Sequence, residues 1–467
     1  MMLGGIGFVD GLKRRRMGKT LKARAMALVA IVLVAGLAAC GAWHRILPNR
    51  VKTGGITISL AGWTFSTRPE FKVLAKAYEK AHPSVRIDLK EYSADDYDKQ
   101  LIADLSASKS PDVFPIKNLR MYYTYADSGK LAKLDDMAVG LAKSKDMRGI
   151  SGYRVDGSVY ALPYRQDVWL LFYNKTMLNK AGIDVPDGSW TWKDYESAAK
   201  RLKSALPKAG YKDAYPTYHH TTWQSVPQGF ALAQQDQGEA NSVFFGGDYR
   251  YLKSVYAMML RMQDEGLMLS YNTVSSSKTT YQSQFGMQKA ALLPMATWYM
   301  GPLTDQQSSG DAQRFEWGVT VLPQRTHDDV SHPKSFGDPT GFAVSGAIGG
   351  AKLKAAKDFV RWACGEEGAK VLADTGTLPA YLSDDVVDRF LARKGMPKDE
   401  ESRRAITDSM TIPENPVGEA TQTIQDELNI AHTSILSETK NMDDALSSAS
   451  KAIVNSGLLD ERYKEGA

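Results

Sequence analysis

Residues 160 to 175 read Y-A-L-P-Y-R-Q-D-V-W-L-L-F-Y-N-K, and three unlike parts follow one another in this stretch. A strand-like lead runs into Pro163, the polar side chains of residues 165 to 167 come next, and residues 168 to 173 form an apolar run. The run is rich in aromatic and branched residues and is too short for a helix, so it predicts a strand buried on both faces. A buried strand entered through a proline and polar residues indicates a crossing between two bodies, with the polar groups beside a ligand cleft. The same pattern also fits an ordinary buried strand whose flanking charges serve only solubility.

The size and charge of the chain narrow the classes of protein it can be. Its 467 residues exceed one ordinary core and predict two or three domains. The formal net charge of +5 comes from the first 39 residues, which hold seven Lys and Arg and one Asp. The remainder has 51 basic and 52 acidic residues, because the whole chain has 58 and 53. The main part of the chain therefore gives no electrostatic reason to expect nucleic-acid binding.

The first 55 residues have the pattern of an export leader and a tether. A basic region ends at Arg24, and the apolar run 26–36 that follows is shorter than a membrane helix needs. Residues 37 to 40, L-A-A-C, look like a bacterial lipobox, which predicts a signal peptide over 1–39 and a lipid on Cys40. Met17 is an alternative start. Residues 40–55 have no periodicity and predict a tether, and the second cysteine, Cys364, is expected to be buried without a disulfide.

The region after the tether alternates strand and helix patterns. Strands are predicted near 56–60, 85–89 and 113–114, with helical spacing over 71–78 and 97–105 between them. This order is typical of a parallel sheet, in which ligands bind beyond the carboxyl ends of the strands. Trp63, Asn118 and Arg120 follow such ends and are expected on a cleft wall.

The second half of the chain contains further strands, helices and a second crossing. A helix is predicted from a cap at residues 191–194, and strands over 290–294 and 317–323. The first of these strands ends at Trp298 and Tyr299. The glycine-rich segment 337–344 predicts the second crossing, where backbones approach closely. A helical pair over 352–375, broken near Gly365, and a last helix near 444–454 complete the pattern.

Taken in order, these segments resemble the family 1 extracellular solute-binding proteins, the sugar-binding lipoproteins that supply ABC importers. Each motif is weak alone, but their order and spacing span nearly the whole exported chain. The matching segments are L-A-A-C at 37–40, Y-A-L-P-Y-R-Q-D at 160–167, Y-N-K at 173–175, W-T-W-K-D-Y at 190–195, K-A-A-L-L-P-M-A-T-W at 289–298, W-G-V-T-V-L-P at 317–323, and 341–379, which ends T-G-T-L-P.

The resemblance implies an α/β fold of two lobes, each a mostly parallel sheet flanked by helices, joined by a multi-strand hinge. Lobe 1 would comprise 56–163 and 337–410, and lobe 2 would comprise 164–336 and 411–467. The family often places an aromatic residue facing the ligand near positions 414–421, where this chain reads E-N-P-V-G-E-A-T. That difference leaves open whether the third crossing, near Glu414, contributes to binding.

The resemblance also implies a lipid-anchored monomer on the outer face of the cell membrane that binds a carbohydrate by hinge closure. It would deliver this ligand to the transmembrane subunits of an ABC permease, without catalytic residues, cofactor or metal. Sugars present C–H patches and hydroxyl groups, so their receptors need aromatic faces and planar polar side chains. The candidate faces are Trp63, Tyr164, Trp223, Trp298 and Tyr299; the candidate polar groups are Asn118, Arg120, Arg165, Gln166, Asp167 and Asp338. Trp169, Trp190, Trp192 and Trp362 are expected in cores, and the basic candidates leave an acidic sugar open.

Three alternatives remain at this point. A secreted carbohydrate hydrolase would need two carboxylates roughly 5 to 9.5 Å apart, and Asp167 with Asp338 is the candidate pair. A receptor for a peptide or another polar solute is also compatible. A metal receptor would depend on His219 and His220, whose loop position predicts that they face solvent.

Overall fold

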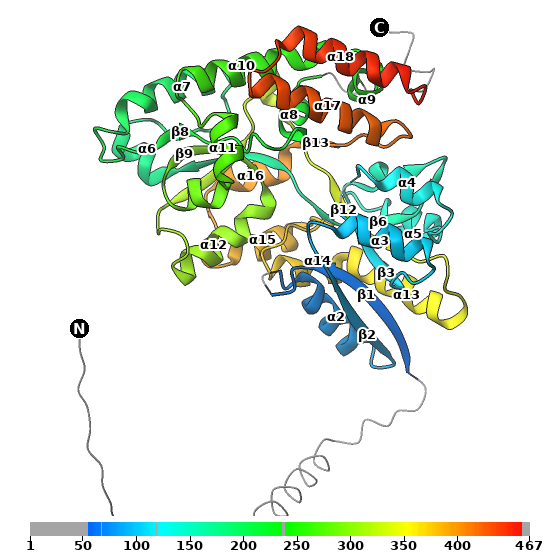
Figure 1. Ribbon diagram of the computed structural model, residues 1–467. Helices are drawn as coiled ribbons and strands as arrows, with labels where there is room; N and C mark the ends of the chain where they lie inside the picture. Colours follow the sequence, from blue (N-terminus) through cyan, green and yellow to red (C-terminus); the bar gives the residue numbers. More distant parts are fainter. Residues whose placement is uncertain (1–54, 67, 118, 236–238, 460–467) are drawn as a thin grey trace, which may run out of the picture. The chain divides into compact units, whose positions relative to one another are not determined.

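The computed structural model describes residues 55–459, except 67, 118 and 236–238 (Figure 1). The predicted signal peptide, most of the tether and the lipidation site at Cys40 lie outside these residues, as does Asn118. In the part that is described, no helix combines the length and apolar character that crossing a membrane requires.

The first hydrophobic core is built on a five-stranded sheet with the order β2-β1-β3-β12-β6. Strands β2, β1 and β3 are parallel, whereas β12 runs antiparallel to both β3 and β6. The parallel part is the one that the strand and helix alternation predicts, and β12 runs in the opposite direction because it enters from the other core. The strands are β1 (Ile56–Trp63), β2 (Val85–Tyr92), β3 (Val113–Ile116), β6 (Ala161–Gln166) and β12 (Pro339–Val344).

Helices α2 and α13 pack against each other and against this sheet, as Figure 1 shows for the blue and yellow helices. The predicted break near Gly365 is confirmed, because α13 ends at Cys364 and α14 begins at Glu366. The elements are α2 (Glu70–Ala81), α3 (Tyr97–Ser106), α4 (Tyr122–Asp127), α5 (Asp135–Leu141), η1 (Ile150–Tyr153), the hairpin β4 (Arg154–Val155) and β5 (Ser158–Val159), α13 (Gly350–Cys364) and α14 (Glu366–Ala373).

The second core is built on a four-stranded sheet with the order β10-β7-β9-β8. Its central strand β7 is buried along its whole length, which confirms the prediction made from the apolar run. β7 pairs antiparallel with β9 and β10, and β9 pairs parallel with β8. The strands are β7 (Trp169–Asn174), β8 (Tyr215–Thr217), β9 (Ala290–Ala296) and β10 (Trp317–Val321).

Most of the remaining helices belong to the second core. The predicted cap of α7 is confirmed: the side chains of Thr191 and Asp194 form a complete capping box. The elements are α6 (Lys175–Ala181), α7 (Trp192–Ala205), α8 (Ser225–Ala233), α9 (Glu239–Phe245), η2 (Arg250–Leu252), α10 (Lys253–Asp264), α11 (Tyr271–Ser277), η3 (Gln282–Gly286), η4 (Thr297–Tyr299), α12 (Met300–Ser309), η5 (Asp328–Ser331), α15 (Asp384–Ala392), α16 (Glu400–Asp408), α17 (Thr421–Leu436) and α18 (Met442–Asn455).

The chain leaves one core for the other at the two predicted crossings. The first joins β6 to β7, and the second joins β11 (Lys334–Phe336) to β12. A Cβ atom on Gly337 would lie 2.2 Å from the carbonyl oxygen of Asp167, so only glycine allows the two crossings to approach this closely. β11 also pairs parallel with β13 (Met410–Ile412), which leads into the segment around Glu414.

The third transfer differs from the expected boundary near residue 410. Helix α14 contributes Leu372 to the first core but Ala369 and Ala373 to the second. Helices α15 and α16 then belong to the second core; Ser402 of α16 bonds the backbone of β10, its Oγ accepting from the Val319 amide at 3.1 Å. The amphipathic pattern of these helices predicts a buried face, but it does not say which core that face covers.

Candidate functional site

Arg165, the penultimate residue of β6, lies at the centre of a buried polar network at the first crossing. Its Nη1 is 3.3 Å from Oε1 of Glu70, and its Nη2 donates to Oγ1 of Thr340 at 3.0 Å. Its Nε is 2.9 Å from Oδ2 of Asp167, but the groups are misaligned for a hydrogen bond, so this contact is an ion pair. Buried charges with partners on several sides are held in one geometry. Arg165 is therefore a rigid polar centre where the two cores meet.

Asp167 connects this network to the second core. Oγ1 of Thr297 donates to its carboxylate at 3.1 Å and accepts from the amide of Val168 at 3.2 Å. Burial raises the pKa of Asp167 above its ordinary value, while Arg165 and the Thr297 hydrogen bond oppose that rise. Asp167 thus ties the first crossing to the residue that precedes Trp298.

Sequence reasoning missed Glu70, which is only 1% exposed. Its carboxylate accepts from the hydroxyl of Tyr164 at 3.0 Å and from that of Thr377 at 3.3 Å, besides pairing with Arg165. A glutamate in the first turn of a helix usually faces solvent. Its position beyond the carboxyl end of β1 could have indicated a site residue, because ligand sites form at that end of a parallel sheet.

Trp298 presents a partly exposed aromatic side chain from the second core. It packs edge-on against the buried Trp169, with ring centroids 5.5 Å apart, and lies 6.2 Å from Trp223. Tyr281, which sequence reasoning missed, is 6.2 Å from Trp223 and also partly exposed. These four rings form an aromatic group beside the Arg165 network.

A pocket between the cores joins Trp298 to the polar network. Its volume of 30 Å³ leaves room for about one water molecule or one ligand oxygen. The residues that line it come from both cores: Arg68, Pro69, Glu70, Arg165, Trp298, Gly301, Pro302, Asp305, Thr375, Gly376 and Thr377. An aromatic face and planar charged groups therefore converge here, as recognition of a hydroxyl-rich ligand requires.

Three predicted aromatic faces are packed inside the cores. Tyr164 is 1% exposed and stacks on Phe342 with centroids 4.1 Å apart, and Tyr299 is fully buried. Trp63 is 3% exposed and packs edge-on against Phe71. In this structure these rings support the site from behind and offer little surface to a ligand.

Two predicted polar residues, Gln166 and Asp338, form hydrogen bonds with the chain segments at the crossings. Nε2 of Gln166 donates to the carbonyl oxygens of Asp167 and Gly337, at 3.0 and 3.2 Å. The Asp338 carboxylate accepts from the amides of Leu119 and Asn415, each at 3.0 Å, and from Nδ2 of Asn415 at 2.6 Å. Both side chains bind backbone across the hinge, which leaves Asp338 poorly placed to act as a hydrolytic acid.

The segment around Glu414 lies close to Asp338 and to Trp169. Burial raises the pKa of Glu414 to about 7, and the charge of Asp338 adds to the rise. Burial likewise raises the pKa of Asp338 to about 6, although its hydrogen-bond donors oppose this. The third chain segment thus contributes a buried carboxyl group beside the crossings.

Arg120 reaches across to α17 of the second core. Its Nε donates to Oε1 of Gln422 at 3.0 Å, and its guanidinium forms an ion pair with Asp426. The side chains of Arg120 and Asp426 are 38% and 55% exposed. Arg120 therefore connects the two cores at the surface in this conformation.

The expectation that His219 and His220 face solvent is wrong, since they are 1% and 9% exposed. Nε2 of His219 is 2.8 Å from the hydroxyl of Tyr195, and Nδ1 of His220 is 3.0 Å from that of Tyr218. Burial lowers the pKa of His219 to about 3 and that of His220 to about 4. Within the described residues, no three His, Cys, Asp or Glu side chains are grouped to hold a metal ion.

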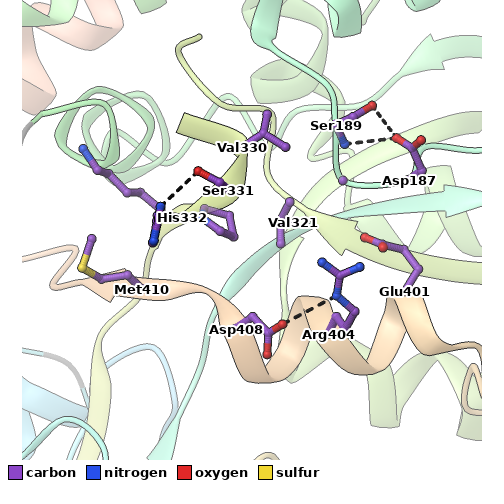
Figure 2. Close-up of a pocket in the computed structure, with 13 residues that line it drawn as sticks. Asp187, Ser189, Val321, Val330, Ser331, His332, Glu401, Arg404, Asp408 and Met410 are labelled. Carbon is purple, nitrogen blue, oxygen red and sulfur yellow. Dashed lines mark hydrogen bonds and ion pairs between the residues drawn. The ribbon is translucent and has the colours of Figure 1, made fainter. Parts of the chain in front are cut away.

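A larger pocket of 530 Å³ lies elsewhere on the second core (Figure 2). Figure 2 shows Arg404 directed toward Asp408 and Ser189 hydrogen-bonded to Asp187. Several polar side chains of the pocket therefore pair with one another. The sequence gives no motif for this pocket, and none of the predicted site residues lines it. Its lining comprises Asp187, Gly188, Ser189, Val321, Val330, Ser331, His332, Pro333, Lys334, Glu401, Arg404, Asp408 and Met410.

Comparison with known proteins shows the family to which this chain belongs. The family model of the bacterial extracellular solute-binding proteins matches residues 65–370, which include both crossings. The chain belongs to this family.

Two relatives of this solute-binding protein are named for different ligands. The melibiose/raffinose/stachyose-binding protein MelE of Bacillus subtilis is 23% identical over 371 residues, which is 78% of this chain and 82% of the relative. An sn-glycerol-3-phosphate-binding periplasmic protein of Pectobacterium atrosepticum is 23% identical over 327 residues, which is 66% of this chain and 70% of the relative.

Solved structures show the same two-lobed fold. A sugar transporter from Rhizobium etli in an open conformation is 28% identical, with a TM-score of 0.75, over 86% of this chain and 99% of that one. An ABC substrate-binding protein from Listeria monocytogenes in complex with cycloalternan is 20% identical, with a TM-score of 0.71, over 87% of this chain and all of the other. The expected two-lobed α/β fold is confirmed. The second sheet, however, is mostly antiparallel and not mostly parallel as expected, because β7 pairs antiparallel with both of its neighbours.

Proposed function

We propose that this solute-binding protein binds a sugar or oligosaccharide between its two cores and passes it, chemically unaltered, to the permease of an ABC importer. The observation that carries the proposal is the convergence of Trp298, from the second core, with Arg165 and Glu70, from the first, on one pocket. A ring face suits the C–H patches of a sugar, and charged planar groups suit its hydroxyls.

The ligand acts by favouring the closed arrangement of the cores. Each core supplies part of the contact set, so the full set forms only when they approach, and the ligand shifts the population accordingly. Asp167 and Gln166 support this function by fixing the chain where it crosses. Trp223 and Tyr281 extend the ring surface beside Trp298.

The cellular setting follows from the family and the leader. We infer a monomer on the extracytoplasmic face of the cell membrane, attached through a lipid on Cys40, with no cofactor and no enzymatic step. The leader pattern and the L-A-A-C sequence at 37–40 support this anchor. Asn118 stays a predicted ligand residue on the strength of its position after β3.

A thermal-shift screen against mono- and oligosaccharides tests the proposal. A ligand that binds only the folded protein raises the melting temperature by mass action, about 2.7 kcal/mol of stabilisation at a hundredfold excess over Kd. We expect at least one saccharide to give a saturable rise and to be recovered intact. The proposal fails if the whole panel leaves the melting temperature unchanged, or if a saccharide is cleaved.

A further inference from the structure

Arg68 lies in the loop between β1 and α2, which sequence reasoning did not assign to the site. The loop leaves the carboxyl end of β1, where parallel sheets bind ligands. Thr64 has a φ of 53°, in the left-handed region that a branched residue rarely adopts. The loop is held by the amide of Arg68, which donates to the carbonyl of Thr64 at 2.8 Å, and by that of Phe65, which donates to Glu91 at 2.6 Å. A strained turn fixed in this way is typical of ligand-binding segments.

Arg68 is half-buried, and its guanidinium has no hydrogen bond or ion pair to any residue that the structure describes. It lines the pocket that contains Arg165 and Trp298. The two acids of that pocket already have other partners: Glu70 pairs with Arg165, and Asp305 pairs with Arg393 at 2.8 Å. Arg68 is therefore a charged donor at the pocket that a ligand acceptor can engage.

A second cation lies near Arg68. Burial lowers the pKa of Lys117, and the charges of Arg68 and Arg165 lower it further, while Asp95 and Asp98 act in the opposite direction. Nζ of Lys117 lies 5.6 Å from the centre of the Trp63 ring and donates to the Ala94 carbonyl at 2.6 Å. Arg68 and Lys117 carry the same charge, so an anion bound near both would be attracted by both.

Arg68 also acts electrostatically on Tyr281 of the second core and on Asp167 at the first crossing. Burial raises the pKa of Tyr281, and the charge of Arg68 opposes this rise; the same charge opposes the rise that burial causes in Asp167. Arg68 therefore lies within electrostatic reach of the aromatic group of the second core. A ligand stacked on Trp298 would have its substituents near this guanidinium.

We propose that Arg68 is a ligand-binding residue and that it binds an anionic group, a carboxylate or a phosphate, carried by the saccharide or polyol. This inference rests on the proposed function and narrows its ligand class. A guanidinium matches both groups in a two-pronged geometry, and Lys117 adds a second positive charge.

Matched pairs of probes test the inference on the purified full chain: galacturonic acid against galactose, and glycerol 3-phosphate against glycerol, by calorimetric titration at low salt. The acidic member of at least one pair should bind at least tenfold more tightly than its neutral partner. Arg68→Gln should remove that advantage, a loss of about tenfold or more, and change the neutral affinity less than about twofold. The control is Arg86→Gln, whose side chain is 71% exposed and which should bind every probe as the parent does.

The two pairs distinguish a carboxylate from a phosphate ligand. Equal affinities within both pairs, or an acid preference that survives Arg68→Gln, would overturn the inference, and so would an equal loss of acidic and neutral ligands in that variant. Binding of neutral saccharides would then leave the proposed function standing. If neither these probes nor a wider saccharide panel binds the parent, the proposed function itself fails.

Discussion

Trp298 is the residue on which ligand affinity should depend most. Replacement by alanine removes an exposed ring face but leaves the polar network around Arg165 in place. We expect Trp298→Ala to weaken saccharide binding at least about 30-fold, as loss of a central aromatic anchor does. The melting temperature should fall by less than about 4 °C. Calorimetry and thermal unfolding measure the two effects.

Trp362→Ala is the matched control, because this half-buried tryptophan packs on Tyr78 in the first core. It should bind the ligand with the parental affinity. Normal binding by Trp298→Ala, or its failure to fold, would contradict the placement of the site.

Glu70 should matter for stability as well as for the site. Glu70→Ala removes one of the two buried carboxylates that pair with Arg165, and it removes the acceptor of the hydroxyls of Tyr164 and Thr377. Loss of one partner of a buried pair costs about 3 kcal/mol of unfolding free energy. Asp88→Ala, which breaks an exposed ion pair, should cost less than about 1 kcal/mol. Similar denaturant midpoints for the two variants would argue against a rigid network.

At this scale the sequence singled out the polar residues 165–167, which precede a recognisable strand, and Trp298, which follows one; their contact with a ligand stays a prediction. The sequence did not indicate Glu70 or Arg68. An acidic residue at the start of a helix and a basic residue in a loop both resemble ordinary surface residues. It also could not separate exposed from buried rings: Tyr299 adjoins Trp298 in the chain, yet it points into the core. That difference depends on the turn after β9, which residue types alone do not specify.

At the scale of elements, the loop between β8 and α8 is joined to α17 through a buried histidine. Nε2 of His432 is 2.7 Å from the carbonyl of Thr221, and its Nδ1 is 3.2 Å from the hydroxyl of Tyr256. Burial lowers the pKa of His432 from 6.5 to about 4, although the Thr221 hydrogen bond opposes this. The imidazole is therefore neutral in the folded protein at pH 7.

This histidine should make the protein less stable in acid. The unfolded state binds a proton below about pH 6.5, whereas the folded state does so only near pH 4, so stability is lost as the pH falls between these values. His432 should contribute roughly 2 kcal/mol to the loss of stability at pH 5 relative to pH 7.5, in addition to the loss from the buried His219 and His220. His432→Gln should show a smaller difference between these two pH values in urea unfolding; an equal difference would show that His432 does not carry the effect.

The order of elements could be predicted from the sequence, since strands and helices differ in periodicity and the cap at Thr191 is explicit. The assignment of α15 and α16 to a core could not, because an amphipathic helix presents the same pattern to either partner. The antiparallel direction of β12 could not be predicted either, because it depends on the strand entering the first sheet from the other core. These features depend on packing between segments that are distant in the chain.

At the scale of the whole molecule, a variant of Arg120 tests whether this residue connects the two cores or contacts the ligand. Its partners Gln422 and Asp426 are on the second core, and their pairing is exposed. An exposed pair is worth up to about 1 kcal/mol, so Arg120→Gln should lower saccharide affinity by no more than about fivefold. A loss as large as that of Trp298→Ala would instead place Arg120 on the ligand.

Asp426→Ala supplies the matching test, because it removes the partner and leaves Arg120 in place. Both variants should have the same small effect if the pair only helps to hold the cores together. A normal affinity for Asp426→Ala combined with a large loss for Arg120→Gln would contradict that role.

The central claim is that two cores close on a saccharide and release it unchanged. Small-angle X-ray scattering of the purified protein with and without a saturating saccharide, followed by chromatography of the recovered ligand, tests it most directly. The account predicts a smaller radius of gyration in the bound protein and full recovery of the intact saccharide. An unchanged radius at saturation, or a cleaved product, would contradict it.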